Sequence, residues 1–286
     1  MRNLISLAVI VLISLFTFSC EKEKSAENST IKACSFNIRF DNPDDGFNNW
    51  ENRRKNVVNF LGVEQPDVIG FQEVLASQLE YIETRLTDYT RIGVGRDDGV
   101  SAGEFAPVLF RTGRFELKDS GTFWLSETPE VPSIGWDAVI KRICTYVFLK
   151  DTESGKEIHF YNTHFSHVGP LARLRSAELI MNRISEESEG VRVILTGDLN
   201  TEPGSDPYNE IIDGGLADSY ESDLRLGPVG TYNGFRLTGT HDRRIDFIFF
   251  RGFQSRYYVA NSIVIDNQYL SDHFPIIALL EYRSMD

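Results

Sequence analysis

The sequence predicts a single large α/β domain in which sheets lie in the middle and helices cover them. Short β-rich runs recur from residue 31 onward, and several are apolar at every position, such as VRVIL and IDFIFF. Such runs are typical of strands covered on both faces. Amphipathic helical patterns lie between them, and no repeat, low-complexity stretch or linker divides this part of the chain. Interleaved strands and helices of this kind favour a layered α/β sandwich.

About ten strands are expected, each rich in β-branched and aromatic residues. They span residues 31–38, 67–71, 106–110, 115–125, 143–149, 158–163, 191–195, 245–250, 257–265 and 276–282. Helices are expected where apolar residues recur at spacings of three and four. These span residues 51–61, 76–86 and 171–184.

Composition supports a globular domain and excludes several other classes of protein. Of 286 residues, 41% are hydrophobic and 25% charged, which is enough for a core and excludes disorder, collagen and a polytopic membrane protein. Only three cysteines are present, which excludes a disulfide scaffold. Cys34 and Cys144 lie in apolar, strand-like runs, so buried thiols are favoured over a bridge, although the sequence leaves their pairing open.

The charge balance limits the substrates that the protein can bind. There are 42 Asp and Glu residues against 29 Lys and Arg, and the net charge is −13. A broad nucleic-acid-binding surface needs clustered Lys and Arg, which this composition argues against. A small phosphate-binding cleft remains compatible with it if a metal ion supplies the positive charge.

The first twenty residues are typical of an export signal. Arg2 precedes an apolar run over residues 4–18, which has the length of a secretory h-region. Ser19 before Cys20 resembles a bacterial lipoprotein cleavage site, with an ordinary signal peptide or an uncleaved anchor as alternatives. We therefore predict a signal peptide over residues 1–19, a charged tether over 20–30 and one folded domain over 31–286. These features predict a monomeric lipoprotein of the cell envelope, facing the periplasm or the surface, with its N-terminal lipid in the membrane.

Polar residues collect at the ends of the predicted strands, where loops can gather them into one cleft. Singly, each can be structural: an Asp-x-Asn pair can form a turn, and a histidine can lie satisfied in a core. Together they supply carboxylates, amides and imidazoles, which suits metal-assisted attack on a phosphorus centre. The segments are SFNIR with Asn37, GFQEV with Gln72 and Glu73, YNTHFSH with Asn162, His164 and His167, LTGDLN with Asp198 and Asn200, RRIDFIFF with Asp246, and YLSDHFP with Asp272 and His273.

The ordered combination of GDLN, RIDFIF and a C-terminal SDHFP resembles the endonuclease/exonuclease/phosphatase superfamily over almost all of the predicted domain. That superfamily includes pancreatic-type DNases, abasic-site repair nucleases, neutral sphingomyelinases, inositol polyphosphate 5-phosphatases and mRNA deadenylases. The resemblance implies a four-layer α/β sandwich, in which two packed mixed β-sheets are flanked by helices. The stretches FNIRFDNPDDGFNNWENRR, FWLSETP and GWDAVIKR resemble a bacterial branch nearer the deadenylases and sphingomyelinases than the DNA-repair enzymes, and with the lipoprotein-like N-terminus this implies a bacterial lipoprotein branch.

The resemblance and the chemistry of the side chains together suggest a role for each residue. Mg²⁺ is usually held by one or two carboxylates plus waters and phosphate oxygens, so Glu73 is the expected direct ligand, with Mn²⁺ as an alternative ion. His273 is the expected general base, oriented by Asp246. Further expected roles are metal binding for Asn37 and Asp272, positioning of the nucleophile and phosphoryl group for Asp198 and Asn200, donation to a phosphoryl oxygen for His164, and substrate binding for Arg142 and Asn162.

One position departs from the DNA-repair members of the superfamily. They carry an acidic residue two places after the first-strand Asn, and here that place is Arg39. A ligand is lost and a cation gained, which weakens the case for DNA-repair activity.

The prediction is therefore a divalent-metal-dependent phosphoesterase that acts outside the cytoplasm by His-activated attack of water on a phosphodiester or phosphomonoester. The substrate classes left open are nucleic acid, phospholipid headgroup and sugar phosphate. A non-catalytic module that binds a phosphate ligand on the same fold is the alternative. A zinc hydrolase is disfavoured, because no HxxxH or paired Cys/His spacing is present.

Overall fold

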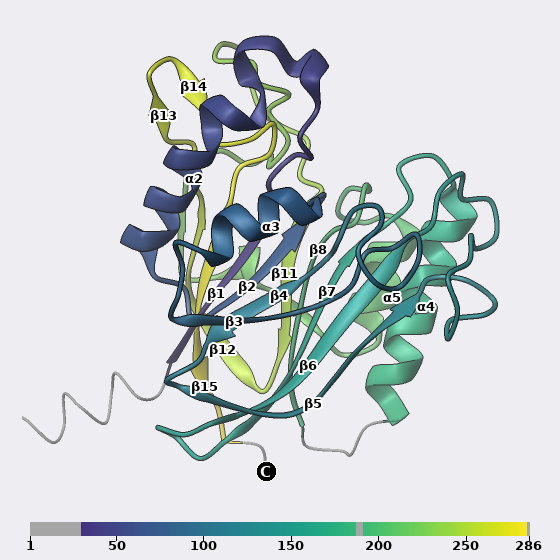
Figure 1. The fold of residues 1–286 in the computed structure, drawn as a ribbon. Coiled ribbons are helices and arrows are strands. Elements are labelled where there is room, and N and C mark those ends of the chain that lie inside the picture. Colours follow the sequence, from purple (N-terminus) through teal and green to yellow (C-terminus); the bar gives the residue numbers. More distant parts are fainter. Residues whose placement is uncertain (1–29, 187–190, 285–286) are drawn as a thin grey trace, which may run out of the picture.

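The computed structural model describes residues 30–186 and 191–284. Within them two β-sheets pack face to face, with helices on both outer sides, so the four-layer α/β sandwich is confirmed (Figure 1). The predicted signal peptide, Cys20 and nearly all of the tether lie outside the described residues. No helix among the described residues has the length and apolar character needed to span a membrane.

The first sheet has seven strands and is covered by two helices, α2 (Trp50–Glu64) and α3 (Ala76–Glu83). Its centre pairs β1 in parallel with β2 and antiparallel with β15. Its strands in spatial order are β10 (Leu224–Leu226), β12 (Phe253–Ala260), β15 (Ile276–Tyr282), β1 (Thr30–Asn37), β2 (Val68–Gln72), β4 (Val108–Arg111) and β3 (Tyr89–Ile92).

The second sheet has six strands and is covered by α4 (Pro170–Glu186) and α5 (Asp206–Asp213), on the right in Figure 1. Here β7 runs parallel to β8, and β8 pairs antiparallel with β11. Its strands in spatial order are β5 (Phe115–Trp124), β6 (Ile143–Asp151), β7 (Glu157–His164), β8 (Arg192–Asp198), β11 (Asp246–Arg251) and β9 (Ala217–Asp218).

The structure differs from the predicted set of strands and helices mainly in short elements. The structure adds the short strands β3, β9 and β10, the eight-residue helix α5 and two 3-10 helices, η1 (Pro43–Asn48) and η2 (Ser219–Glu221). The run predicted as one strand over residues 257–265 is divided between β12 and a hairpin of β13 (Val264–Ile265) and β14 (Gln268–Tyr269). Cys34 and Cys144 are buried, and neither forms a disulfide within the described residues.

The space between the sheets changes character along the strands. Alternate residues of a strand point to the same face, and on β7 the inward-facing series is Ile158, Phe160, Asn162 and His164. On β1 the corresponding series runs from Ile31 to Asn37. The inter-sheet core is therefore apolar at one end and polar at the other, and the polar end holds the candidate site.

Candidate active site

The register of the second sheet places three of the predicted catalytic residues in one row. His164 is paired with Asp198 across the parallel β7–β8 ladder, and Asp198 is paired with Asp246 across the antiparallel β8–β11 ladder. All three end or begin their strands at the polar end, and all are buried. Three segments that are far apart in sequence thus contribute adjacent side chains.

The first sheet contributes Asn37 at the end of β1 and Glu73 just after β2. The Asn37 amide nitrogen donates to Glu73 Oε1 (3.1 Å) and to Asp198 Oδ2 (3.0 Å), so it connects carboxylates from both sheets. Its oxygen accepts from the Arg39 N–H (3.0 Å). Asn37 therefore holds the acidic side chains in place, and its predicted part in metal binding stays a prediction.

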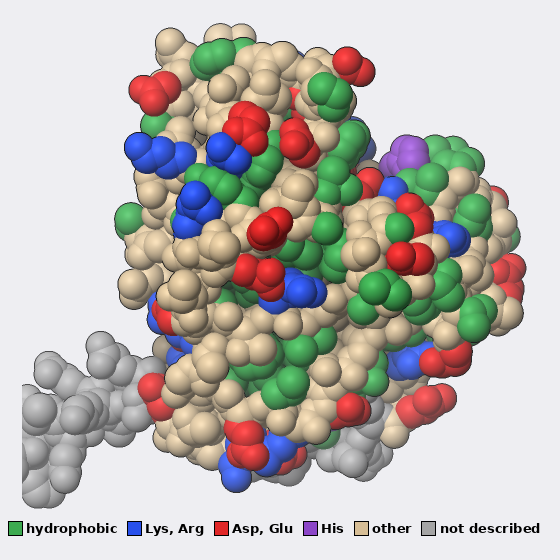
Figure 2. Space-filling view, in the orientation of Figure 1, with side chains coloured by type: hydrophobic (Ala, Val, Ile, Leu, Met, Phe, Trp, Pro, Cys, Tyr) green, Lys and Arg blue, Asp and Glu red, His purple; other side chains and the backbone are tan. Residues whose placement is uncertain are grey.

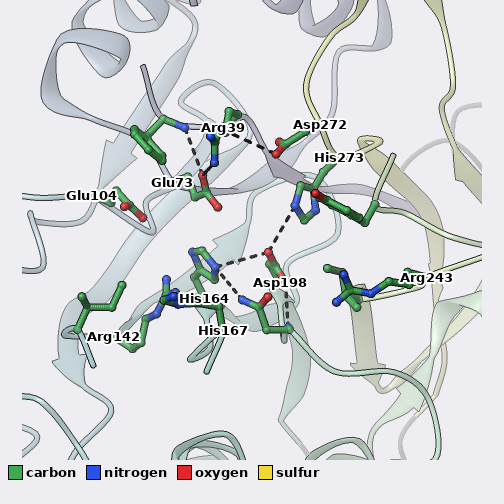
Figure 3. A pocket seen from close by; sticks show the side chains of 15 residues that line it. Arg39, Glu73, Glu104, Arg142, His164, His167, Asp198, Arg243, Asp272 and His273 are labelled. Carbon is green, nitrogen blue, oxygen red and sulfur yellow. Dashed lines mark hydrogen bonds and ion pairs between the residues drawn. The ribbon is translucent and has the colours of Figure 1, made fainter. Parts of the chain in front are cut away.

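His273 and Asp246 form the predicted dyad. His273 Nδ1 lies 2.8 Å from Asp246 Oδ2. Its other nitrogen, Nε2, lies 3.8 Å from Asp198 Oδ2 (Figure 3). Burial alone would lower the pKa of His273, but the carboxylates of Asp246, Asp198 and Asp272 hold it well above its ordinary value. The imidazole is thus fixed at one nitrogen, and the other faces the remaining site residues.

The acidic residues of the site are buried close to one another. Burial and the neighbouring Asp246 carboxylate raise the pKa of Asp198 to about 7. Burial also raises the pKa of Asp272. Because these carboxylates are buried close together, a cation among them would relieve their mutual repulsion.

The donor set fits a divalent cation at the Glu73 side of the site. Oxygens of Glu73 and Asp198 and a nitrogen of His164 lie within 4.8 Å of one another. Carboxylate oxygens are the ligands that Mg²⁺ and Mn²⁺ prefer. Asp198, Asp246 and His273 form a second group whose possible ligand atoms lie within 4.8 Å of one another. In that group Asp246 Oδ2 is already hydrogen-bonded to His273. Glu73 and Asp198 are therefore the residues that would hold the ion.

His164 and Asn200 stand beside Asp198. His164 Nε2 lies 3.1 Å from the Asn200 amide nitrogen and 3.5 Å from Asp198 Oδ2, while the Asn200 backbone N–H donates to Asp198 Oδ1 (2.9 Å). Burial and the guanidinium groups of Arg142 and Arg96 hold the pKa of His164 well below its ordinary value. His164 is therefore neutral at physiological pH and can form a hydrogen bond without adding charge.

Arg142 provides a cation in the opposite wall of the site. It is 4% exposed, and its Nε and Nη1 atoms have no hydrogen-bond partner among the residues that the structure describes. Its Nη2 lies 3.1 Å from His167 Nδ1. Burial and the nearby Arg96 guanidinium lower the pKa of Arg142 to about 10, so it remains charged. A buried guanidinium with unpaired donors is suited to bind an anion.

These groups surround one open cavity of about 470 Å³. In Figure 3, His164, Asp198 and His273 point toward one another, with Arg142 on one side and Arg243 on the other. Sequence reasoning did not assign Tyr232, Arg243 or Glu104 to the site individually, although all three lie in polar or aromatic stretches between strands. The cavity is lined by Arg39, Phe40, Glu73, Glu104, Ile140, Arg142, His164, His167, Asp198, Asn200, Tyr232, Arg243, Ile245, Asp272 and His273.

Asn162 does not reach the cavity, and its predicted role in substrate binding is corrected. Its nitrogen donates to the backbone oxygens of Phe71 (2.6 Å) and Pro107 (3.0 Å), and its oxygen accepts from Gln72 Nε2 (2.7 Å). At Gly70 a Cβ would lie 2.4 Å from the Asn162 oxygen, so glycine is required for this approach of the two sheets. Asn162 therefore joins the sheets beneath the site.

Comparisons with known proteins agree with this geometry. The chain is 39% identical to an endonuclease/exonuclease/phosphatase from Bacteroides vulgatus, with a TM-score of 0.85 over 89% of this chain and 99% of that one. It is 35% identical to the mannosyl-6-phosphatase of Bacteroides thetaiotaomicron, with a TM-score of 0.83 over 88% of this chain and all of that one. Mouse tyrosyl-DNA phosphodiesterase 2 is 25% identical, and the match covers 79% of this chain but 57% of that protein.

A family model described as the endonuclease/exonuclease/phosphatase family matches residues 34–273, from β1 to the dyad histidine. The match covers most of the chain and includes every residue assigned here to the site. Members of this family are divalent-metal-dependent phosphoric ester hydrolases, in agreement with the acidic site and the dyad. The chain therefore belongs to the endonuclease/exonuclease/phosphatase family.

Proposed function

We propose that the protein is a Mg²⁺-dependent phosphoesterase that hydrolyses a small phosphomonoester, a sugar phosphate, by attack of a water molecule that His273 activates. Mn²⁺ is the alternative ion. The observation that carries the proposal is the His273–Asp246 dyad, which faces buried carboxylates in a cavity whose other wall holds the unpaired Arg142 guanidinium.

Each residue has a role that follows from its position. Asp246 binds His273 Nδ1, which leaves Nε2 to accept a proton from the attacking water. An ion held by Glu73 and Asp198 would polarise the phosphoryl group and stabilise its developing negative charge. Arg142 would donate to the phosphoryl oxygens, with Asn200 and His164 as further hydrogen-bonding groups. Because a base must be deprotonated, the raised pKa of His273 predicts activity that increases with pH on the alkaline side of about 6.5.

Two observations favour a sugar phosphate over a polynucleotide. The chain carries a net charge of −13, and on the face shown in Figure 2 basic side chains alternate with acidic ones. Polynucleotide binding depends on clustered cations along the strand. The mannosyl-6-phosphatase of Bacteroides thetaiotaomicron is similar over nearly the whole domain.

The test compares substrates with and without metal. Mannose 6-phosphate, glucose 6-phosphate, p-nitrophenyl phosphate, bis-p-nitrophenyl phosphate and 5′-tyrosyl single-stranded DNA would be assayed in Mg²⁺, Mn²⁺ and EDTA. We expect kcat/KM to be at least about tenfold higher for the monoesters than for the diesters and to be lost in EDTA. Preference for a diester would overturn the substrate assignment. Binding of all sugar phosphates without turnover would favour the alternative, a non-catalytic module.

We also propose that the enzyme acts at the cell envelope, held by a lipid on Cys20. Thr30, at the start of β1, lies about 23 Å from the site at its end, taking about 3.3 Å per residue. A tether joined there would leave the cavity free for substrate. Replacing Cys20 with Ser should release the protein from the membrane fraction. Unchanged membrane association of that variant would contradict the lipoprotein assignment.

A further inference from the structure

Arg39 lies among three carboxylates at the edge of the cavity. Its Nε and Nη2 atoms donate to both oxygens of Asp45, each at 3.0 Å. Its Nη1 lies 3.9 Å from Glu73 Oε2, and its Nε lies 3.9 Å from Asp272 Oδ2. The three acids come from separate segments, η1, the residue after β2 and the loop before β15. Figure 3 shows the guanidinium between Glu73 and Asp272.

The backbone at Arg39 is held in a strained conformation. Its φ is +59°, which is unfavourable for a residue with a Cβ. The Arg39 N–H donates to Asn37 Oδ1 (3.0 Å), and its carbonyl accepts from Gln78 Nε2 (3.0 Å). Its guanidinium also packs on the Phe40 ring, 4.5 Å from the ring centroid. The chain thus maintains an unfavourable backbone conformation that keeps this cation in one place.

The position of Arg39 limits where a metal ion can bind. The guanidinium occupies the space between Glu73 and Asp272, so a divalent cation cannot bridge these two carboxylates. The other side of Glu73 faces His164 and Asp198, whose ligand atoms lie within 4.8 Å of it. Only that side combines converging ligands with the space of the cavity.

We propose that Arg39 is a resident cation in the place that a second metal ion would need, so that the enzyme binds a single divalent ion, at Glu73 and Asp198. Asp272 then holds Arg39 and is not a metal ligand, contrary to the prediction from sequence. This inference rests on the metal dependence in the proposed function. It predicts that removing the guanidinium exposes three uncompensated carboxylates, from Asp45, Glu73 and Asp272, to a second ion.

The test counts bound Mn²⁺ by electron paramagnetic resonance and by calorimetry, without substrate. The wild-type protein should bind one ion per chain, and Arg39→Ala should bind two. Arg39→Lys keeps the charge and should bind one. Glu73→Gln should weaken the single site by more than about tenfold, whereas Asp272→Asn should leave its affinity within about threefold. Arg54→Ala is the matched control, because Arg54 does not line the cavity, and it should bind one ion.

Each alternative outcome is decisive. Two ions in the wild-type protein, one ion in folded Arg39→Ala, or equal loss of affinity in Asp272→Asn and Glu73→Gln would overturn the inference. If Arg39→Ala does not fold, the counts for the wild-type and Asp272→Asn proteins still decide it. Absence of any bound ion in the wild-type protein would overturn the proposed function as well.

Discussion

At the end of the sandwich opposite the cavity, Arg114 is surrounded by hydrogen-bond acceptors. At the cavity end, Arg142 has hydrogen-bond donors without a partner among the described residues. Arg114 bonds Asp67 (2.9 Å), Asp151 (3.1 Å) and the Thr30 carbonyl (2.7 Å). Arg142 Nε and Nη1 are buried without a partner in the described part of the chain. Both arginines are largely buried, so the difference lies in their partners.

The carboxylates at the two ends differ in the same way. Burial would raise the pKa of Asp151, but hydrogen bonds from Arg114 and Tyr282 hold it below its ordinary value. At the other end, burial and Asp246 raise the pKa of Asp198 to about 7. One end satisfies its charges internally and stabilises the fold. The other leaves them to be satisfied by ligands, which is the usual compromise at a functional site.

The largest expected effect is at the dyad. His273→Ala should lower kcat by about 10²–10⁴-fold, because the general base is lost. Asp246→Asn should also be severe, and the double variant should be little worse than the more damaging single one, because the two residues act as a unit. Steady-state kinetics and thermal melts would be measured together. Near-normal kcat in folded His273→Ala would exclude His273 as the base.

The row of catalytic residues could be predicted from the sequence because strand alternation determines which side chains face inward. His164, Asp198 and Asp246 each lie at the end of an apolar run, and the same pattern predicts β7, β8 and β11. Strand alternation does not determine how far below the cavity an inward-facing side chain lies. Asn162 shares its face with His164 but lies one layer deeper, where the main chain of β2 covers it.

Loop partners could not be predicted, because they depend on tertiary contacts that no local pattern encodes. The pairing of Arg39 with Asp45 depends on the turn of η1 and on the positive φ of Arg39. The sequence therefore predicted the strands and most site residues, but not the contacts that assign Asn37, Asn162 and Arg39 their roles.

Exchanging each arginine for methionine tests the contrast between the two ends. Arg114→Met should destabilise the fold by about 3 kcal/mol, or roughly 6–12 °C in Tm, because it leaves the buried Asp151 carboxylate with one charged partner fewer. Its kcat should be unchanged. Arg142→Met should leave Tm unchanged or higher and should raise KM for the phosphate ester. The same loss of Tm in both variants would show that the two ends are alike.

Metal binding should stabilise the protein, and this stabilisation should depend on residues at the cavity end and not on residues at the opposite end. At an ion concentration 100 times Kd, Mg²⁺ or Mn²⁺ should stabilise the wild-type protein by about 2.7 kcal/mol, since the unfolded chain has no such site. In Glu73→Gln, most of the rise in Tm on adding the ion should be lost. Asp67→Asn, at the opposite end, should have a lower Tm without metal but the same rise in Tm when metal is added. Melting curves in EDTA and in added metal would measure both. An equal increase in Glu73→Gln and wild type would exclude Glu73 as a ligand.

The smallest effect is expected from Asp198→Asn in metal-free buffer. The pKa of Asp198 is about 7 in the fold and about 3.8 in the unfolded chain. Its contribution to stability is therefore fully present below about pH 3.8 and is lost as pH rises toward 7. Removing the charge should make the variant more stable than wild type near neutrality by about 1 kcal/mol, or roughly 2–4 °C, although its activity is lost.

Asp151→Asn supplies the control of opposite sign for that prediction. Because the pKa of Asp151 is lowered in the fold, its stabilisation is present above the unfolded value of about 3.8 and is lost as pH falls through the folded pKa. Its variant should melt below wild type at pH 7, with a difference that shrinks in acid. The Tm of the Asp198 variant should instead rise relative to that of wild type as the pH increases from 4.5 to 7.5. If both variants shift Tm in the same direction across this range, the uncompensated charge assigned to the cavity end is wrong, because burial alone would then account for both carboxylates.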